Sequence, residues 1–451
     1  MIPCKAEEIC RAVGGTLLQS GNAVSSVSTD SRTVGAGQLF IPLVGERFDG
    51  HAYIQMALEK GAEGCLCAKV PETLLPGKFY IQVADTTVAL RDLAAWYRGR
   101  FAIPVVQISG SAGKTTTKEM IASVLSQHFV TLKTKGNLNN QFGTPQTLLQ
   151  LEREHQAAVI ETGIATFGDL RHLGVAVQPT VAVLTNVGDA HIENMNHSRL
   201  GVLQAKSEIF ESLHADGLAV LNGDDELLST LQLPQKTLRC GKSENCDVRV
   251  TDIVERGMAG IDCTVTTAKK SYRLSIPSPG EYMIYPASMA TAIAEELGLS
   301  EEEIVAGVAG YLTTGSRMRR VTLREDRLLV DDCYNANPQA MASALRILAG
   351  TAGHRLAILG DMGELGELSP AAHRAAGELA AQLQLDAVVA IGPKSADIAV
   401  GGGELVQHFL TIEEAMPAIH KLFTPGTTVL LKASHSMGFT KIAKELEETY
   451  Q

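Results

Sequence analysis

This 451-residue chain lacks long apolar segments, clusters of basic residues and Cys-x-x-Cys pairs. No apolar run approaches the roughly 18–20 residues of a membrane-spanning helix. The first residues lack the basic end and apolar core of a signal peptide. Hydrophobic residues make up 45% of the chain and charged residues 20%, as in ordinary globular proteins. These features predict a cytoplasmic protein with no membrane partner.

The charge balance argues against nucleic acid as a partner. The net charge is −11 at pH 7, and no block of basic residues is visible. Surfaces that bind polyanions are usually basic, so neither nucleic acid nor an anionic membrane is expected to bind. The eight cysteines are scattered and form no Cys-x-x-Cys pair. Reduced thiols are therefore expected rather than disulfides or a zinc site.

The length and the order of predicted elements indicate an α/β protein of three domains, at about 150 residues each. Residues 1–102 are expected to form a small α/β domain that binds substrate. Residues 103–313 are expected to form the central domain, whose alternating strands and helices are typical of a largely parallel sheet. Residues 314–451 show the same alternation of strands and helices, which predicts a Rossmann-like domain. Alternating β-branched and polar residues at 248–276 predict antiparallel strands.

Apolar periodicity gives bounds for the individual elements. The predicted strands are 39–43, 157–162, 180–185, 217–221, 328–331, 355–359, 387–391 and 428–431. The predicted helices are 7–13, 87–100, 118–129, 287–297, 300–311, 339–349, 370–384, 412–422 and 440–448.

The chain is organised around Gly110-Ser-Ala-Gly-Lys-Thr115, which lies between an apolar run and an amphipathic stretch. A strand, a glycine turn and a helix together direct backbone N–H groups and the positive helix end at phosphate. The Walker pattern would need a glycine where the chain has Ile108, and an ordinary glycine-rich turn is the alternative. Because Lys-Thr and the flanking elements are present, the motif predicts nucleotide binding. The expected ATP-binding residues are Gly110, Ser111, Ala112, Gly113, Lys114, Thr115 and Thr116.

Polar residues also follow neighbouring strands of the central domain. Glu161, Asn186 and His191 each lie at or just after predicted strand ends, where open α/β sheets bind their ligands. Glu161 and His191 can supply an oxygen and a nitrogen ligand to a metal. Together with the hydroxyl of Thr115 they predict a Mg²⁺ site, because a metal near the γ-phosphate offsets charge during attack on phosphorus. A hydrogen-bonded structural histidine is the alternative interpretation of His191.

These motifs resemble those of the Mur ligase family, which also contains folylpolyglutamate synthases. The resemblance implies an ATP-dependent carboxylate–amine ligase of peptidoglycan precursor synthesis, with UDP-N-acetylmuramoyl-tripeptide and D-alanyl-D-alanine as substrates. ATP would convert the tripeptide carboxylate into an acyl phosphate, which the dipeptide amine would attack. A monomer is expected. The matching segments are Thr29–Arg32, Gly45–His51, Gly136–Leu149, Thr185–Glu193, Ala205–Phe210, Asp331–Pro338 and Leu359–Gly366.

The resemblance also implies roles for single residues. Thr115, Glu161 and His191 resemble Mg²⁺ ligands. Lys206 resembles a lysine that relatives carbamylate so that it binds a second Mg²⁺, and a plain surface lysine is the alternative. Lys114, Lys206, His191 and Glu161 are the expected catalytic residues. The third domain is expected to close on ATP and to contact it through Arg317 and Asp332. The expected substrate-binding residues are Ser31, Arg32, Arg47, Asp49, His51, Asn137, Asn139, Asn140, Asn335 and Asn337.

The chain departs from the family pattern in two places. Tyr282, Met283 and Pro286 stand where the family has His-Asn-x-x-Asn, and His435 stands where it has arginine. Met and Pro side chains donate no hydrogen bond, and histidine lacks the guanidinium fork, so weaker ATP or dipeptide binding is expected. A non-catalytic relative that binds nucleotide or sugar as a regulator is one alternative. A folylpolyglutamate-type ligase is the other, although it should lack Asn-Leu-Asn-Asn and Tyr-Asn-Ala-Asn-Pro.

Overall fold

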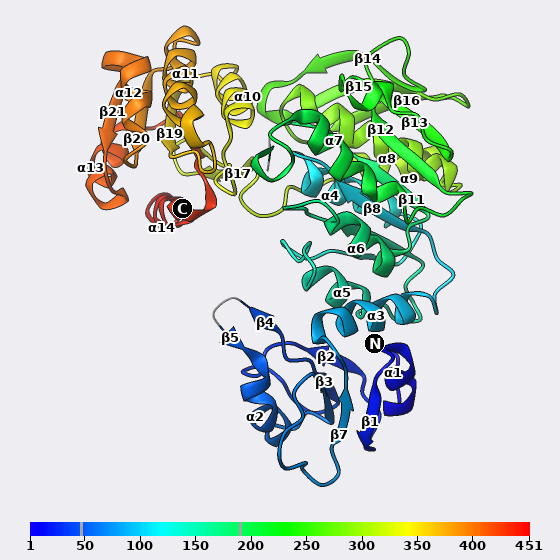
Figure 1. The fold of residues 1–451 in the computed structure, drawn as a ribbon. Coiled ribbons are helices and arrows are strands. Elements are labelled where there is room, and N and C mark those ends of the chain that lie inside the picture. Colours follow the sequence, from blue (N-terminus) through cyan, green and yellow to red (C-terminus); the bar gives the residue numbers. More distant parts are fainter. Residues whose placement is uncertain (46–47, 189–191) are drawn as a thin grey trace. The chain divides into compact units, whose positions relative to one another are not determined.

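A computed structural model describes residues 1–45, 48–188 and 192–451 and divides into two compact units. The first unit comprises Met1–Thr251, Thr264–Tyr272 and Ile284–Gly310, and the second comprises the remaining described residues. Both units are α/β (Figure 1), as predicted. Within the described ranges, no helix is long and apolar enough to cross a membrane.

The first sheet of the first unit has five strands in the order β1-β7-β6-β3-β2. β1 is antiparallel to β7, and the other neighbours are parallel. The short strands β4 (Val44–Gly45) and β5 (Phe48–Asp49) pair separately. The remaining elements are α1 (Ala6–Ala12), β1 (Thr16–Gln19), β2 (Ser26–Ser28), β3 (Gln38–Phe40), α2 (Ile54–Glu59), β6 (Gly64–Cys67), β7 (Phe79–Gln82) and α3 (Thr86–Arg98).

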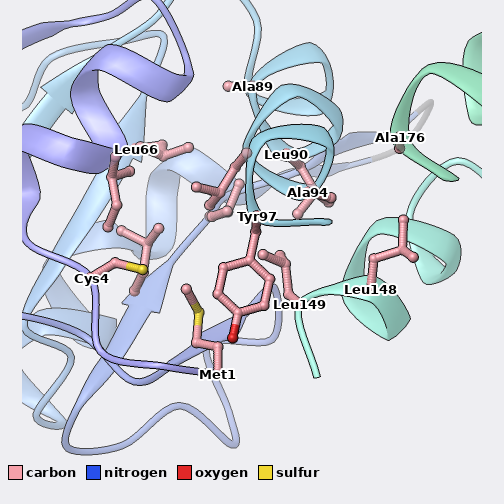
Figure 2. Close-up of a cluster of buried hydrophobic side chains, with 14 of the residues drawn as sticks. Met1, Cys4, Leu66, Ala89, Leu90, Ala94, Tyr97, Leu148, Leu149 and Ala176 are labelled. Carbon is pink, nitrogen blue, oxygen red and sulfur yellow. The ribbon is translucent and has the colours of Figure 1, made fainter. Parts of the chain in front are cut away.

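Helix α3 joins this sheet to the helices of the next one. Asp85 is the N-cap of this helix, since its carboxylate accepts from the N–H groups of Thr87 and Val88. Its buried residues share one core with side chains from β6, α5 and α6 (Figure 2). Within that core the Tyr97 hydroxyl accepts from Ile2 N–H and donates to Leu151 C=O, both at 2.7 Å. The two parts of the first unit therefore share one hydrophobic core.

The second sheet has nine strands in the order β16-β15-β14-β13-β12-β11-β8-β10-β9. Along this order from β9 to β14, each strand is parallel to the next one. The boundary between the two units runs through β14, β15 and β16. The strands are β8 (Val105–Ser109), β9 (Thr131–Lys133), β10 (Ala157–Glu161), β11 (Val181–Leu184), β12 (Leu218–Asn222), β13 (Lys236–Gly241), β14 (Val248–Glu255), β15 (Ile261–Thr266) and β16 (Ser271–Ile276).

The central strands β8, β10, β11 and β12 are buried along their whole length. Helices cover both faces of such a sheet, so side chains on both faces are buried and the strand sequences are continuous apolar runs. β8 lies between β10 and β11, which is where the strand order reverses, and ligands of open α/β sheets bind at such a switch point. The helices are α4 (Lys114–Leu125), α5 (Gly143–Leu148), α6 (Asp169–Val177), α7 (Arg199–Ser207), α8 (Ile284–Glu296) and α9 (Glu301–Ala309).

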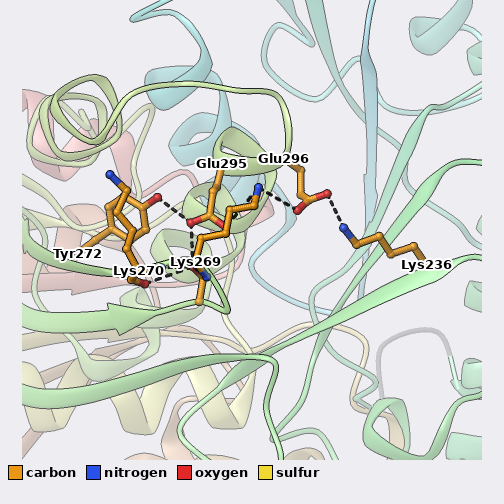
Figure 3. A network of polar contacts seen from close by, with 7 residues as sticks. Lys236, Lys269, Lys270, Tyr272, Glu295 and Glu296 are labelled. Atoms are coloured by element: carbon orange, nitrogen blue, oxygen red, sulfur yellow. Dashed lines mark hydrogen bonds and ion pairs between the residues drawn. The ribbon is translucent and has the colours of Figure 1, made fainter.

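Helix α8 packs against α4 and ends in an ionic network (Figure 3). Glu295 and Glu296 occupy its last turn, where the helix dipole disfavours negative charge. Lys236 contacts Glu296 at 2.5 Å, Lys269 lies near both carboxylates, and the Tyr272 hydroxyl donates to Glu295 at 2.7 Å. These contacts offset the acidic helix end and tie it to β13 and β16.

The second unit is built on a six-stranded sheet in the order β17-β18-β22-β19-β20-β21. Only the β17–β18 pair is antiparallel. Neighbouring residues alternate between two cores, with Leu329 on one face and Val330 on the other, so helices cover both faces (Figure 1). The elements are β17 (Arg319–Leu323), β18 (Arg327–Asp331), α10 (Pro338–Ala349), β19 (His354–Gly360), α11 (Ser369–Gln382), β20 (Ala387–Ile391), α12 (Ala396–Gly402), β21 (Val406–Phe409), α13 (Ile412–Leu422), β22 (Thr427–Lys432) and α14 (Thr440–Tyr450).

Candidate active site

The phosphate loop connects β8 to α4, and two of its positions require glycine. Gly110 has a φ of 149°, and a Cβ there would lie 1.9 Å from Oγ1 of Thr185. Gly113 has a φ of 77° and is the N-cap of α4. The helix begins at Lys114, four residues before the predicted start, so its first N–H groups point toward the loop. Nζ of Lys114 donates to Gly110 C=O at 2.7 Å, which keeps the ammonium group over the loop.

Asn186, just after β11, holds the loop in place. Its side chain accepts from Ala112 N–H at 2.8 Å and donates to Ala112 C=O at 3.1 Å. Its backbone carbonyl accepts from Ser111 N–H at 3.1 Å. The N–H groups of Ser111 and Ala112 are thus engaged by Asn186, so the donors that face a phosphate are those of the first turn of α4.

Glu161 meets the loop from the end of β10. The Thr115 hydroxyl donates to Oε2 of Glu161 at 2.8 Å, and Nδ2 of Asn139 donates to Oε1 at 2.9 Å. The Glu161 side chain is only 3% exposed. The structure therefore brings together three residues predicted for the metal and substrate sites.

Lys206 lies on α7 and is buried, with 1% of the residue exposed, so the interpretation as a plain surface lysine is wrong. Burial, together with the smaller effect of the nearby Lys114 charge, lowers the pKa of Lys206 to about 7. At neutral pH much of this amine is therefore neutral. His191 and Arg47, predicted for the metal and substrate sites, lie outside the described residues.

Three asparagines in the loop after β9, Asn137, Asn139 and Asn140, form hydrogen bonds that stabilise this loop. The side-chain oxygen of Asn140 accepts from the N–H groups of Phe142 and Gly143 at the start of α5. The backbone carbonyl of Asn137 accepts from Asn139 N–H. These contacts fix the loop and hold Asn139 against Glu161.

Asp49, the last residue of β5, and His51 just after it form a cluster. His51 Nδ1 contacts Asp49 at 2.7 Å, and its Nε2 accepts from Ala68 N–H, so the proton is on Nδ1. Hydrogen bonds from Lys69 and His51 lower the pKa of Asp49. The His51 side chain is 6% exposed, and these contacts organise the loop that carries it. Arg32, by contrast, has a side chain that is 84% exposed, and it pairs with Asp30.

Ser31, the neighbour of Arg32, contributes its backbone carbonyl to a contact with Nζ of Lys60 at 3.3 Å. Lys60 Nζ lies equally close to the carbonyl of Arg32. The segment is therefore held by its main chain.

The second unit holds the remaining predicted residues near the ends of β18 and β22. Lys432 contacts Asp332 at 2.6 Å, and Asp332 also accepts from Met318 N–H. The Arg317 guanidinium lies 3.7 Å from the centroid of the Tyr334 ring, a cation–π contact.

Two asparagines follow on the way to α10. Asn337 is the N-cap of α10, since its side chain accepts from Ala340 N–H at 2.8 Å. The Asn335 side chain accepts from Ala336 N–H, and its own carbonyl accepts from Lys432 at 3.1 Å. Both residues thus have structural contacts as well as their predicted substrate role.

The departures from the family pattern have structural consequences. Pro286 lies in the first turn of α8, where proline is tolerated because the N–H it lacks would be unbonded. Met283 is 1% exposed, whereas Tyr282 is 39% exposed. His435 packs beside Tyr334, with ring centroids 5.8 Å apart.

The oxygen ligands beside the loop fit Mg²⁺. Thr115 and Glu161 supply a hydroxyl and a carboxylate, the hard oxygen donors that Mg²⁺ prefers. The described residues contain no group of three or more His, Cys, Asp or Glu that could hold a metal ion. Mg²⁺ sites of nucleotide-dependent enzymes commonly take one or two carboxylates and complete their shell with water and phosphate, so two protein oxygens suffice.

A phosphate loop at the switch point of an open parallel sheet, with a buried carboxylate beside it, defines an enzyme of the nucleotide-dependent class. Models of the Mur ligase family, catalytic domain, the Mur ligase middle domain and the Mur ligase glutamate ligase domain match residues 23–98, 108–294 and 316–435. The chain belongs to the Mur ligase family, as predicted.

Named relatives match the chain from end to end. UDP-N-acetylmuramoyl-tripeptide–D-alanyl-D-alanine ligase of Escherichia coli is 34% identical and covers 99% of both chains. The Bacillus subtilis enzyme of the same name is 32% identical over 100% of this chain and 99% of its own. A crystal structure of MurF from Acinetobacter baumannii superimposes with a TM-score of 0.91, at 32% identity and 99% coverage of both chains. The shared fold confirms the predicted three-domain architecture.

A second solved structure is MurF ligase from Thermotoga maritima in complex with ADP, with a TM-score of 0.83 and 27% identity. It covers 94% of this chain and 97% of its own. Folylpolyglutamate synthase from Mycobacterium tuberculosis has a TM-score of 0.63 at 16% identity, which shows a shared fold alone.

Proposed function

We propose that the protein is an ATP-dependent ligase that joins D-alanyl-D-alanine to UDP-N-acetylmuramoyl-tripeptide in peptidoglycan precursor synthesis. The observation that supports it most is the Thr115–Glu161 hydrogen bond of 2.8 Å beside a phosphate loop, in a chain that matches ligases of this name over its whole length. The folylpolyglutamate-type alternative rests on shared fold alone. We expect a cytoplasmic monomer.

The reaction requires a carboxylate to be activated before an amine can attack it. The tripeptide carboxylate oxygen attacks the γ-phosphorus of ATP, the bond to ADP breaks, and an acyl phosphate forms. The dipeptide amine then attacks the acyl carbon, loses a proton, and inorganic phosphate leaves. The acyl phosphate supplies both the leaving group and the driving force for an amide bond.

The residues of the loop bind and orient the triphosphate. Gly113 and the first turn of α4 direct N–H groups at the phosphates, and Lys114 offsets the charge of the transferred phosphoryl group. Thr115 and Glu161 would hold Mg²⁺, and His191 is a further proposed ligand. When bound, the metal stabilises charge on the phosphoryl oxygens. Asn137, Asn139 and Asn140 orient the acyl group.

Lys206 is proposed to carry a carbamate. A neutral amine is the form that adds to CO₂, and burial lowers the pKa of Lys206 to about 7. The carbamate replaces a cation by an anion, which relieves repulsion with Lys114 and provides oxygens for a second Mg²⁺.

The other predicted residues are proposed to bind substrate away from the loop. Ser31, Arg32, Arg47, Asp49 and His51 would bind or organise the site of the UDP-sugar. Arg317 and Asp332 would bind ATP, and Asn335 and Asn337 would bind the dipeptide.

Phosphate release tests the reaction directly. ATP, Mg²⁺ and UDP-muramoyl-tripeptide are combined with the protein, and phosphate is measured before and after D-alanyl-D-alanine is added. Dipeptide-dependent phosphate and a UDP-muramoyl-pentapeptide product are expected. Parallel assays with the meso-diaminopimelate and lysine tripeptides identify the preferred substrate. Nucleotide binding without product would instead favour the non-catalytic regulator suggested by Met283, Pro286 and His435.

A further inference from the structure

A row of charged side chains runs from the buried Glu161, through the buried Lys118 and Glu119, to the exposed Lys133. Nζ of Lys118 lies 2.9 Å from Oε1 of Glu119 and 3.8 Å from Oε2 of Glu161. It also donates to Thr134 C=O at 2.8 Å. Nζ of Lys133 contacts Oε2 of Glu119 at 2.5 Å. The Lys118 and Glu119 side chains are 1% and 8% exposed, whereas Lys133 is 44% exposed.

The position of Lys118 follows from the helix. It lies four residues after Lys114 on α4, one turn farther along the same face. A buried ammonium group is costly unless it is paired, and Lys118 has two carboxylates within reach. The nearer is Glu119, so most of its charge is offset there. Burial raises the pKa of Glu119, but the ammonium groups of Lys133 and Lys118 lower it by more, which keeps Glu119 ionised at neutral pH.

We propose that Glu119 holds the Lys118 ammonium group off Glu161 and thereby sets how strongly Glu161 binds a divalent cation. An ammonium group and Mg²⁺ compete for the same carboxylate, because each offsets its charge. Lys118 already lies within 4 Å of Glu161, and the closer Glu119 limits this competition. Lys118 and Glu119 are therefore positioning residues. The inference rests on the proposed function, in which Glu161 is a metal ligand.

The test is the Mg²⁺ concentration that gives half-saturation, measured by calorimetry of Mg²⁺-dependent ADP binding and by the ligation rate. Glu119→Gln keeps the shape of the side chain but removes its charge, so Lys118 turns to Glu161. We expect half-saturating Mg²⁺ to rise by about fivefold or more. Adding Lys118→Met removes the competing cation and should return the value to within about twofold of wild type.

Lys133→Gln is the matched control, since it removes the exposed partner of Glu119. Exposed ion pairs contribute little, so a shift below about twofold is expected. The proposal is wrong if Glu119→Gln shifts the Mg²⁺ requirement no more than this control, or if the double variant keeps the shift. General destabilisation lowers the folded fraction, which thermal melting reports, without changing the Mg²⁺ requirement of folded molecules.

A second comparison applies if Glu119→Gln does not fold. Because Glu119 acts through Lys118, Lys118→Met and the double variant should require the same Mg²⁺ within about twofold. A larger difference between them contradicts the proposal. If the proposed function is wrong, the wild-type protein releases no dipeptide-dependent phosphate. Calorimetry can still compare the half-saturating Mg²⁺ concentrations of the variants in that case, so the two failures are distinguishable.

Discussion

At the scale of single residues, Asn186 fixes the shape of the phosphate loop, because its side chain hydrogen-bonds to both the N–H and the C=O of Ala112. We predict that Asn186→Ala raises the KM for ATP by about tenfold, since two hydrogen bonds that hold the loop are lost. Asn194→Ala is the control, because Asn194 is exposed and bonds only to Ala165 C=O among the described contacts. Steady-state kinetics with varied ATP measure both. Equal KM values for the two variants would contradict the role of Asn186.

Lys206 gives a second prediction at this scale. Lys206→Ala removes the proposed carbamate and should lower kcat by about 10²-fold or more, because a metal that stabilises phosphoryl charge is lost. A small carboxylate such as acetate should restore part of the rate by supplying the missing oxygens. Lys236→Ala, which alters an exposed lysine of β13, is the control. Full activity of Lys206→Ala would contradict a catalytic role for a carbamate on Lys206.

Some residues of the candidate site could be predicted from the sequence and others could not. Lys114, Thr115 and Glu161 could be predicted, because a motif or a strand end identifies them locally. The sequence places Asn186 at a strand end, but its hydrogen bonds to Ala112 and the approach of Lys118 to Glu161 could not be predicted, because they join segments that are far apart in the chain. The burial of Lys206 likewise depends on packing around α7.

At the scale of elements, Asn337 has two possible roles that can be separated. Its side chain caps α10, and replacing such a cap by alanine costs about 0.5–2 kcal/mol. Asn337→Ala should therefore lower the thermal stability of the second unit. Asn337→Ser retains a capping oxygen but not the amide, so it should keep the stability and raise the KM for D-alanyl-D-alanine.

Thr411→Ala is the control for that experiment, since Thr411 caps α13 in the same unit. It should reduce stability to a similar extent and leave the dipeptide KM unchanged. If Asn337→Ser has the wild-type KM, Asn337 is a helix cap and contributes nothing to dipeptide binding.

Elements with strong periodicity were the most predictable. Helix 412–422 and strand 387–391 have the predicted bounds, because apolar residues recur regularly and clear breaks flank both segments. The helix predicted at 118–129 begins instead at Lys114, since Gly113 in a left-handed conformation caps it. The short helices α2, α5 and α12 were not predicted, and α6 and α7 were expected only as helical stretches between strands, without bounds. Tertiary packing stabilises such short segments more than their own sequence does.

At the scale of the whole molecule, the shared core of the first unit predicts common unfolding. The Tyr97 hydroxyl bonds Ile2 and Leu151 inside that core. Tyr97→Phe leaves both backbone groups without this partner and should destabilise the unit by about 1–3 kcal/mol. Calorimetry should show the transition of the first unit at a lower Tm, whereas Tyr53→Phe, at an exposed position, should not move it. An unchanged Tm for Tyr97→Phe would contradict the structural role.

The domain boundaries at residues 102 and 313, and the expected closure of the C-terminal domain on ATP, stay predictions. X-ray scattering of the protein with and without both ligands tests closure. Superimposable profiles would contradict it.

The central claim is that the γ-phosphoryl group of ATP, bound at Lys114, passes to the carboxylate of the tripeptide. The most direct test labels that carboxylate with heavy oxygen and examines the released phosphate by mass spectrometry. Phosphate from the wild-type protein should carry one labelled oxygen, and Lys114→Ala should release almost none. Unlabelled phosphate formed during dipeptide-dependent ligation would contradict the acyl phosphate.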